Sequence, residues 1–240
     1  MPRELRAAAV CEARASRTIG RMAEGGPCTI PRVKCLLVDD HALVRDALAL
    51  LIALHHPQVD LRQAGRLRDA LALLGNEPNV DLVLLDLALP DSAGIATLSA
   101  LREAAPDTRI VVLSADERAE TVLAAIDAGA AGFIPKSTES GVLRQALATV
   151  LAGGVYLPST EGLATSDEGA GAGAADLGLT PRQIDVQRML VDGGSNKRIA
   201  RALDLAPSTV KTHLEAIFER LQVNSRTQAV VAAARLGLRF

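Results

Sequence analysis

The chain has 240 residues, of which 49% are hydrophobic, enough for two modest domains with real cores. No apolar run reaches the roughly 18 residues of a membrane helix, so we expect no membrane span and a cytoplasmic protein. Aromatic residues make up only 2%, which argues against a protein that binds single-stranded nucleic acid by stacking. The cysteines Cys11, Cys28 and Cys35 have neither metal-type nor disulfide-type spacing.

The net charge of −2 is unevenly distributed along the chain. Residues 33–158 contain 10 basic and 16 acidic side chains, a balance of −6, whereas residues 177–240 contain 10 basic and 5 acidic side chains, a balance of +5. The acidic part suits a site for a divalent cation, and the basic part suits a polyanion such as DNA.

Residues 1–32 are rich in arginine and alanine and show no strand pattern, so we expect a disordered N-terminal extension. The basic stretch is not followed by the apolar segment of a secretion signal. An alternative is that Met22, just before the first predicted strand, is the true start of the protein.

Residues 33–158 alternate short apolar runs with amphipathic segments, which is typical of buried parallel strands joined by helices. The predicted strands are 33–39, 59–64, 80–85, 109–114 and 131–135, and the predicted helices are 42–54, 66–75, 94–104, 117–128 and 139–152. Five such units predict an α/β, doubly wound (βα)5 fold, in which right-handed crossovers place helices on both faces of the sheet.

The first predicted helix has one apolar stripe, because leucine and alanine recur there at three- and four-residue steps. The stripe consists of Leu43, Ala47, Leu50, Leu51 and Leu54.

Polar side chains follow the apolar runs where four of the predicted strands end. They are Asp39, Asp40, Asp86, Ser114 and Lys136. In an open α/β sheet the ligand site lies beyond the carboxyl ends of the strands, so we expect these groups around one crevice. Carboxylates suit Mg²⁺, and a carboxylate can also form an aspartyl-phosphate. The pattern therefore predicts a site that moves a phosphoryl group.

The motifs Val38-Asp39-Asp40-His41, Asp86-Leu87-Ala88-Leu89-Pro90, Ser114-Ala115 and Gly132-Phe133-Ile134-Pro135-Lys136 resemble those of the receiver domain of bacterial response regulators. The resemblance covers about residues 33–155. It implies that a sensor histidine kinase phosphorylates Asp86, with Mg²⁺ held by Asp39, Asp40 and Asp86. It also implies that Ser114 and Lys136 bind phosphate oxygens, and that Phe133 is a rotamer switch following Ser114.

Two alternatives remain open at this point. A phosphatase of the haloacid-dehalogenase type also uses a strand-end aspartate, a lysine and Mg²⁺, but it needs a second aspartate two residues after the nucleophile, where this chain has Ala88. A regulator that dimerises constitutively, without phosphorylation, is the other alternative.

His41 is interpreted as a helix-start residue rather than a phosphate donor.

Residues 159–178 are rich in glycine, alanine and serine and predict a flexible linker. Four short helices are predicted after it. Thr180, Pro181 and Gln183 form a helix-start signal with a capping box, and Gly193-Gly194 ends that helix. The next helices are predicted at 196–203, with Ser195 as its N-cap, at 207–221, and from Ser225 to about 236.

Two of these helices, joined by a tight turn, predict a helix-turn-helix. Ala200 is the small residue that allows a close crossing, and Leu203, Leu205 and Val210 fill the interface. The second helix would present polar residues outward, namely Ser208, Thr209, Lys211, Thr212 and Glu215. Lys211 could contact a phosphate or a guanine edge.

The segments Leu179-Thr180-Pro181-Arg182, Gly194-Ser195-Asn196-Lys197, Ile199-Ala200, Thr209-Val210-Lys211-Thr212-His213 and Leu221-Gln222-Val223 resemble the LuxR-type DNA-binding domain, over about residues 177–238. With the receiver, the chain is similar to the NarL/FixJ family of response regulators. The resemblance implies that helix 207–221 enters the major groove of double-stranded DNA and that Asn196 and Lys197 also contact the DNA. It further implies that the last helix forms a homodimer. Ala206 stands where a serine N-cap is usual, Arg198 replaces an acid, and Glu215 leaves the base preference open.

Overall fold

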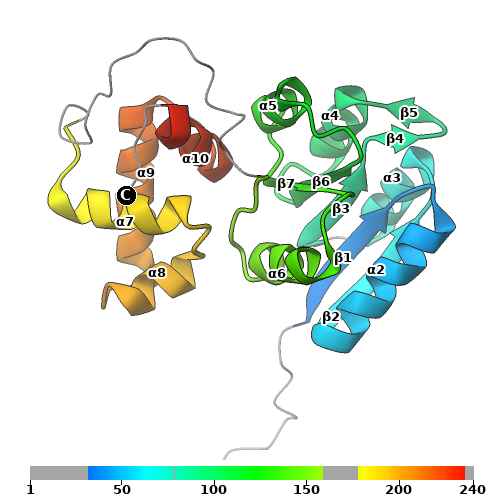
Figure 1. Ribbon diagram of the computed structural model, residues 1–240, viewed down its shortest axis with the longest axis horizontal. Coiled ribbons are helices and arrows are strands. Elements are labelled where there is room, and N and C mark those ends of the chain that lie inside the picture. Colours follow the sequence, from blue (N-terminus) through cyan, green and yellow to red (C-terminus); the bar gives the residue numbers. More distant parts are fainter. Residues whose placement is uncertain (1–31, 78, 159–177, 236–240) are drawn as a thin grey trace, which may run out of the picture. The chain divides into compact units, whose positions relative to one another are not determined.

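The computed structural model describes residues 32–77, 79–158 and 178–235 (Figure 1). The predicted N-terminal extension (1–32) and linker (159–178) lie outside these residues, apart from Arg32 and Gly178 at their edges.

The first part of the chain forms a parallel sheet of five strands in the order β2-β1-β3-β6-β7. Each predicted strand is confirmed to within two residues at its ends. The strands are β1 (Val33–Val38), β2 (Val59–Ala64), β3 (Leu82–Asp86), β6 (Arg109–Ser114) and β7 (Gly132–Pro135). The helices between and after them are α2 (Ala42–His55), α3 (Leu67–Asn76), α4 (Ile95–Ala104), α5 (Ala119–Asp127) and α6 (Ser140–Leu151).

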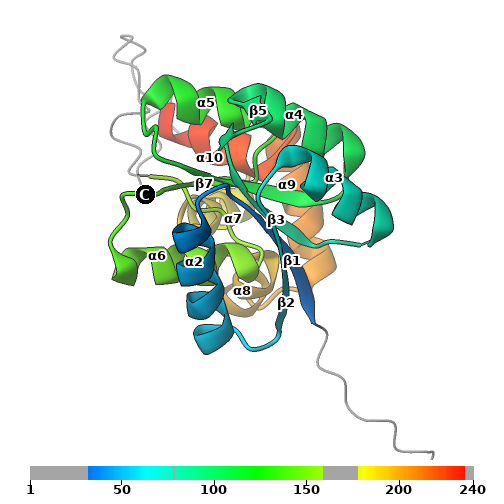
Figure 2. The same ribbon diagram turned by 90° about the vertical axis from the view of Figure 1, so that its right-hand side faces the viewer.

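The helices cover both faces of the sheet, as the doubly wound prediction requires (Figures 1 and 2). Alternate residues of each strand point to opposite faces, so every strand supplies both layers. Leu36 and Leu85 pack with α3, α4 and α5 on one face. Leu37 and Leu84 pack with α2 and α6 on the other. Both layers are apolar, which explains why the strand sequences are continuous hydrophobic runs.

The apolar stripe predicted for the first helix is not its buried face. Leu43, Leu50 and Leu54 are 83%, 70% and 71% exposed, and Ala47 is also exposed. The buried side chains of α2 are instead Leu48 and Ile52. Because α2 is apolar almost all round, periodicity alone could not tell which of its faces the sheet would bury.

A short hairpin that the sequence did not predict follows β3. Its strands are β4 (Ala88–Leu89) and β5 (Ser92–Ala93), paired antiparallel. Asp91 at its turn accepts hydrogen bonds from the backbone N–H groups of Leu67 (2.9 Å) and Arg68 (3.0 Å). The hairpin thereby supplies an acidic cap to the first turn of α3, where the helix dipole favours a negative charge.

The C-terminal part contains the four predicted helices. They are α7 (Pro181–Val191), α8 (Asn196–Ala202), α9 (Pro207–Leu221) and α10 (Arg226–Arg235). The predicted capping box is confirmed, since Thr180 Oγ1 accepts from the N–H of Gln183 and Gln183 Oε1 accepts from the N–H of Thr180. Ser195 caps α8 as predicted. Their apolar faces form one core, which includes Val186, Ile199, Val210 and Ile217.

None of the helices in the described part of the chain is both long and apolar enough to cross a membrane.

Candidate functional site

The carboxyl edge of the sheet brings together the acidic residues that the strand ends predicted. Asp39 follows β1 and Asp86 ends the neighbouring β3, and both residues are buried. Lys136, which follows β7, reaches across the edge, with its Nζ 2.8 Å from Asp39 Oδ2 and 2.6 Å from Asp86 Oδ2. Three strands thus place two carboxylates and one ammonium in direct contact.

The ammonium of Lys136 balances part of the negative charge at this edge. Burial disfavours its charged form, but the hydrogen bonds and charges of Asp39 and Asp86 outweigh burial and raise the pKa of Lys136 above its ordinary value. Lys136 is therefore a permanent cation at neutral pH, held against Asp86 Oδ2.

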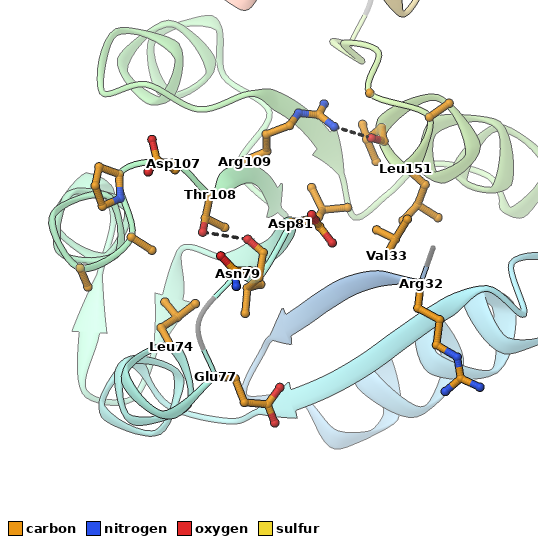
Figure 3. A pocket seen from close by; sticks show the side chains of 18 residues that line it. Arg32, Val33, Leu74, Glu77, Asn79, Asp81, Asp107, Thr108, Arg109 and Leu151 are labelled. Atoms are coloured by element: carbon orange, nitrogen blue, oxygen red, sulfur yellow. Dashed lines mark hydrogen bonds between the residues drawn. The ribbon is translucent and has the colours of Figure 1, made fainter. Parts of the chain in front are cut away.

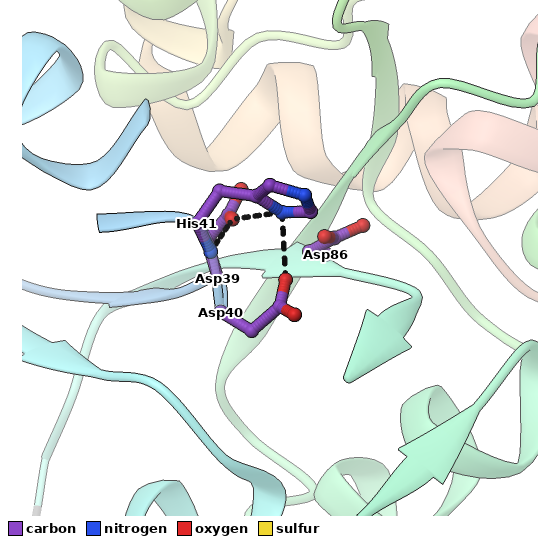
Figure 4. A group of neighbouring side chains, drawn as sticks. All are labelled: Asp39, Asp40, His41 and Asp86. Carbon is purple, nitrogen blue, oxygen red and sulfur yellow. Dashed lines mark hydrogen bonds and ion pairs between the residues drawn. The ribbon is translucent and has the colours of Figure 1, made fainter. Parts of the chain in front are cut away.

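Asp40 and His41 complete the cluster on the α2 side (Figure 4). The side chain of Asp40 is 34% exposed, and its Oδ1 lies 2.7 Å from Nδ1 of His41. Asp39 is fixed by a second contact, because the backbone N–H of His41 donates to its Oδ1 at 2.8 Å. Ligand atoms of Asp39, Asp40, His41 and Asp86 all lie within 4.8 Å of one another. The prediction that His41 is a helix-start residue is confirmed, since it is the N-cap of α2. The sequence did not predict that its imidazole contacts Asp39 and Asp40.

This arrangement fits a divalent cation. Oxygen ligands suit Mg²⁺, which commonly binds through one or two carboxylates and keeps several waters. Three carboxylates carry three negative charges, and one lysine compensates only one of them. The surplus of charge favours binding of a cation beside Asp86.

Ser114 and Phe133 lie on the paired strands β6 and β7, and β6 also pairs with β3, the strand that ends at Asp86. Ser114 ends β6, is 5% exposed, and its Oγ accepts from the N–H of Asp116 at 3.1 Å. Phe133 in β7 is fully buried in the layer beneath α3, α4 and α5. A backbone hydrogen bond also joins Ser114 to Lys136, because the N–H of Lys136 donates to the carbonyl of Ser114 at 2.8 Å.

A hollow of about 830 Å³ lies at the opposite edge of the sheet, at the strand starts (Figure 3). Two of its polar side chains are engaged with the backbone: Thr108 Oγ1 donates to the carbonyl of Val80, and Arg109 donates to those of Val150 and Gly154. These two residues therefore join neighbouring segments of the α/β domain.

The predicted DNA-facing residues of α9 are all exposed, namely Ser208, Thr209, Lys211, Thr212 and Glu215. They share one side of α9, while Val210, Leu214 and Ile217 pack into the helical core. Ala200, a residue of α8, is buried where α8 packs against α9, and Leu203 and Leu205 pack beside it, as the helix-turn-helix pattern predicted. Glu215 Oε1 lies 3.8 Å from Lys211 Nζ, so it partly neutralises that lysine.

The two other predicted contact residues differ from each other. Lys197 is exposed in α8. Asn196 is half-buried, and its Oδ1 accepts a hydrogen bond from Nη1 of Arg226 at 2.7 Å. Asn196 thus ties α8 to α10, a role that sequence reasoning did not assign to it.

Comparison with known proteins matches both parts of the chain. Residues 35–148 match the response regulator receiver domain, and residues 177–233 match the luxR family of bacterial regulatory proteins. A glycerol metabolism activator of Pseudomonas putida is 38% identical over 208 residues, which cover 83% of this chain and 94% of that protein. The chain belongs to the LuxR-type response regulators.

Other members of the family agree with this assignment. The nitrate/nitrite response regulator NarL of Escherichia coli K12 is 35% identical, covering 88% of this chain and 96% of NarL. A structure of RcsB from Salmonella typhimurium shares the fold, with a TM-score of 0.52 and 19% identity over 84% of this chain and 97% of that one. This response regulator is thus a transcriptional regulator and not an enzyme, so the phosphatase alternative is wrong.

Proposed function

We propose that phosphorylation of Asp86 controls sequence-specific DNA binding by this response regulator. The observation that carries the proposal is the contact of Lys136 Nζ with Asp86 Oδ2 at 2.6 Å, in a cluster that also contains Asp39 and Asp40. The Asp86 carboxylate contacts the ammonium of Lys136 and lies beside the carboxylates of Asp39 and Asp40, which are suited to bind a metal ion. Such a carboxylate is suited to accept a phosphoryl group, since positioning and charge neutralisation dominate phosphoryl transfer.

In this proposal a carboxylate oxygen of Asp86 attacks the phosphorus of a phosphohistidine on a sensor kinase. The P–O bond to Asp86 forms as the P–N bond breaks, and the leaving imidazole takes the electron pair and then a proton from water. Lys136 binds one phosphoryl oxygen and the hydroxyl of Ser114 another. Asp39, Asp40 and Asp86 would hold Mg²⁺, and the bound ion would supply positive charge to offset that of the phosphoryl group.

The signal then passes from Asp86 through the buried side chain of Phe133. Ser114 moves to bind phosphate, and Phe133, whose strand pairs with that of Ser114, changes its rotamer. The surface formed by α5 and β7 changes with it. Such a change needs to bias a two-state equilibrium by only a few kcal/mol to alter DNA binding strongly.

We assign residues 33–158 to the receiver, 159–178 to a linker, 179–240 to the DNA-binding domain and 1–32 to an N-terminal extension. In the DNA-binding domain α9 enters the major groove, with Lys197 and Lys211 close to phosphates or guanine edges. A homodimer formed through the last helix would bind two half-sites about one helical turn apart. The proposed compartment is the cytoplasm.

Selection from a pool of genomic duplexes tests this function and identifies the operator in the same experiment. Wild type and Asp86→Asn are each incubated with acetyl phosphate and Mg²⁺, and duplexes that bind are then titrated at fixed salt. The proposal predicts that treatment tightens wild-type binding about tenfold, which corresponds to about 1.4 kcal/mol, and leaves Asp86→Asn unchanged. Equal, tight binding with and without treatment would support the alternative, a constitutively dimeric and phosphorylation-independent regulator.

A further inference from the structure

Two opposite charges lie next to each other on the outward face of α9. Lys211 and Glu215 are one helical turn apart, and their side chains are 73% and 62% exposed. The Nζ of Lys211 lies 3.8 Å from Oε1 of Glu215, which is longer than a hydrogen bond. The ammonium therefore keeps its donors, and the carboxylate keeps its acceptors, for a bound molecule.

The helix presents this charged pair where a recognition helix contacts base edges. Val210 and Leu214 pack into the core of the helical domain, which fixes the face that α9 turns outward. Recognition helices contact bases with their N-terminal residues, and Lys211 is the fifth residue of α9. The hydroxyl of the adjacent Thr212 is already used, because its Oγ1 donates to the carbonyl of Ser208 at 3.3 Å.

A carboxylate on such a helix has few favourable partners in DNA. Phosphates carry the same negative charge, and the major-groove edges of guanine and thymine present hydrogen-bond acceptors. The hydrogen-bond donors in the major groove are the N4 amino group of cytosine and the N6 amino group of adenine. Glu215 therefore stabilises the complex only where an amino group faces it, and it repels the other groups.

The lysine beside it favours a G·C base pair over an A·T base pair. Guanine offers an ammonium the two acceptors O6 and N7, whereas thymine offers O4 alone, next to its methyl group. In a G·C pair the cytosine amino group is hydrogen-bonded to guanine O6, so a donor and an acceptor lie about 3 Å apart on one edge. The 3.8 Å between Lys211 Nζ and Glu215 Oε1 matches that edge in spacing and in polarity.

We propose that Lys211 and Glu215 together recognise one G·C base pair in the operator. The Nζ of Lys211 donates to guanine O6, and the carboxylate of Glu215 accepts from the cytosine N4 amino group. The inference rests on the proposed function in placing α9 in the major groove. It makes Glu215 a specificity-determining residue, which favours one base pair by a hydrogen bond and rejects others by repulsion.

Selection from a pool of random duplexes tests the proposal. The full-length proteins are wild type, Lys211→Ala, Glu215→Ala and Glu219→Ala, each treated with acetyl phosphate and Mg²⁺. Wild type is expected to select half-sites that share one invariant G·C pair. Lys211→Ala and Glu215→Ala are both expected to weaken the preference at that same pair and to keep the preferences at other positions.

Glu219→Ala is the matched control, because it removes a carboxylate from an exposed position one turn further along α9. It is expected to retain every base preference of wild type. All three substituted side chains are exposed, so the variants are expected to fold.

Modified duplexes then test the amino group itself. N4-methylcytosine at the invariant pair leaves only the N–H that is used in base pairing. Binding of wild type is expected to weaken about fivefold or more, the effect of one mismatched pair, whereas Glu215→Ala responds much less. Inosine in place of the guanine is the control duplex, because it keeps O6 and N7 and changes only the minor groove.

Three results would overturn the inference and leave the proposed function intact. Glu215→Ala might bind every duplex more tightly with unchanged preferences, in which case the carboxylate only repels DNA. The two variants losing preference at different base pairs would contradict joint recognition. An invariant A·T pair at the affected position would contradict the choice of G·C.

Other results separate the inference from the proposed function. Wild type that binds duplexes without sequence preference, or does not bind them, would overturn sequence-specific DNA binding and this inference with it. The expected base preferences without any response to acetyl phosphate would overturn only the control of binding by phosphorylation.

Discussion

Lys136 Nζ lies 2.6 Å from Asp86 Oδ2, between the ends of strands that are not neighbours in the sheet. The side chain of Lys136 is 18% exposed and that of Asp86 3%. Because little water reaches either group, the ammonium of Lys136 and the carboxylate of Asp86 stabilise each other's charge in place of water. The same lysine also holds Asp39 at 2.8 Å, so one cation stabilises both buried carboxylates.

Substitution of Lys136 is expected to destabilise the α/β domain. Lys136→Ala leaves Asp39 and Asp86 buried without their cation, and breaking a buried ion pair in this way costs about 3 kcal/mol. Urea unfolding at pH 7 in the absence of divalent ions measures the loss. Arg144→Ala, at an exposed position of α6, is the control and should stay within about 0.5 kcal/mol of wild type. Equal stability of Lys136→Ala and wild type would refute the pairing.

We expect His56 to make the stability of the protein depend on pH. It follows α2, its Nε2 is buried without a hydrogen-bond partner among the described residues, and burial, assisted by the neighbouring His55, lowers its pKa. The folded state thus favours neutral imidazole, while the unfolded chain binds a proton near pH 6.5. Stability should therefore fall as the pH drops from 7 to 5.

The urea midpoint between pH 5 and pH 7.5 measures this dependence. His56→Gln removes the titrating group and should flatten the curve, whereas His55→Gln, at an exposed position, should largely retain the slope. A His56→Gln protein whose midpoint falls with acid as steeply as that of wild type would show that other groups cause the dependence.

Gln187 is a polar side chain in the apolar core of the helical domain. It is fully buried, and neither its Nε2 nor its Oε1 has a hydrogen-bond partner in the described part of the chain. Unsatisfied buried amides cost about 1–3 kcal/mol, so Gln187→Leu should raise the stability of this domain by an amount in that range. Thermal unfolding tests it, with Gln145→Leu at an exposed helical position as the control. A lower melting temperature for Gln187→Leu would point to an unseen partner for the amide.

The N-terminus of α9 lacks a capping side chain, since Ala206 occupies the N-cap with an extended backbone (φ −69°, ψ 145°). Ala206→Ser should add a hydrogen bond to a free N–H of the first turn and stabilise the domain by about 1 kcal/mol. Thr180→Ala, which removes the cap of α7, should cost a similar amount. Calorimetric unfolding of Ala206→Ser and Thr180→Ala measures both changes in stability. No gain from Ala206→Ser would indicate that Pro207 already sets this helix start.

The strands and the acidic edge could be predicted because they depend on local sequence. Apolar runs bounded by polar residues define parallel strands, and parallel strands collect their carboxyl ends at one edge, so Asp39, Asp86 and Lys136 could be placed together from the sequence alone. The caps at Thr180 and Ser195 were predictable for the same reason, since a cap needs only residues three apart.

The features that the sequence did not reveal depend on contacts between distant segments. The buried face of α2 is decided by the sheet beneath it, and a helix that is apolar all round gives no sign of whether Leu48 or Leu50 turns inward. Asp91 caps α3 from 24 residues away. The direction of the His41 imidazole depends on its torsions, for which sequence carries no signal; only its place next to Asp39 and Asp40 could have suggested the contact.

Intact mass measures the phosphorylation of Asp86 without any coupled assay. Wild type and Asp86→Asn are incubated with acetyl phosphate and Mg²⁺ and weighed without delay, because an acyl phosphate hydrolyses. We expect one added phosphoryl group on wild type and none on Asp86→Asn. Addition to both proteins would show that another residue is the acceptor, and addition to neither would contradict a phosphoryl-accepting site.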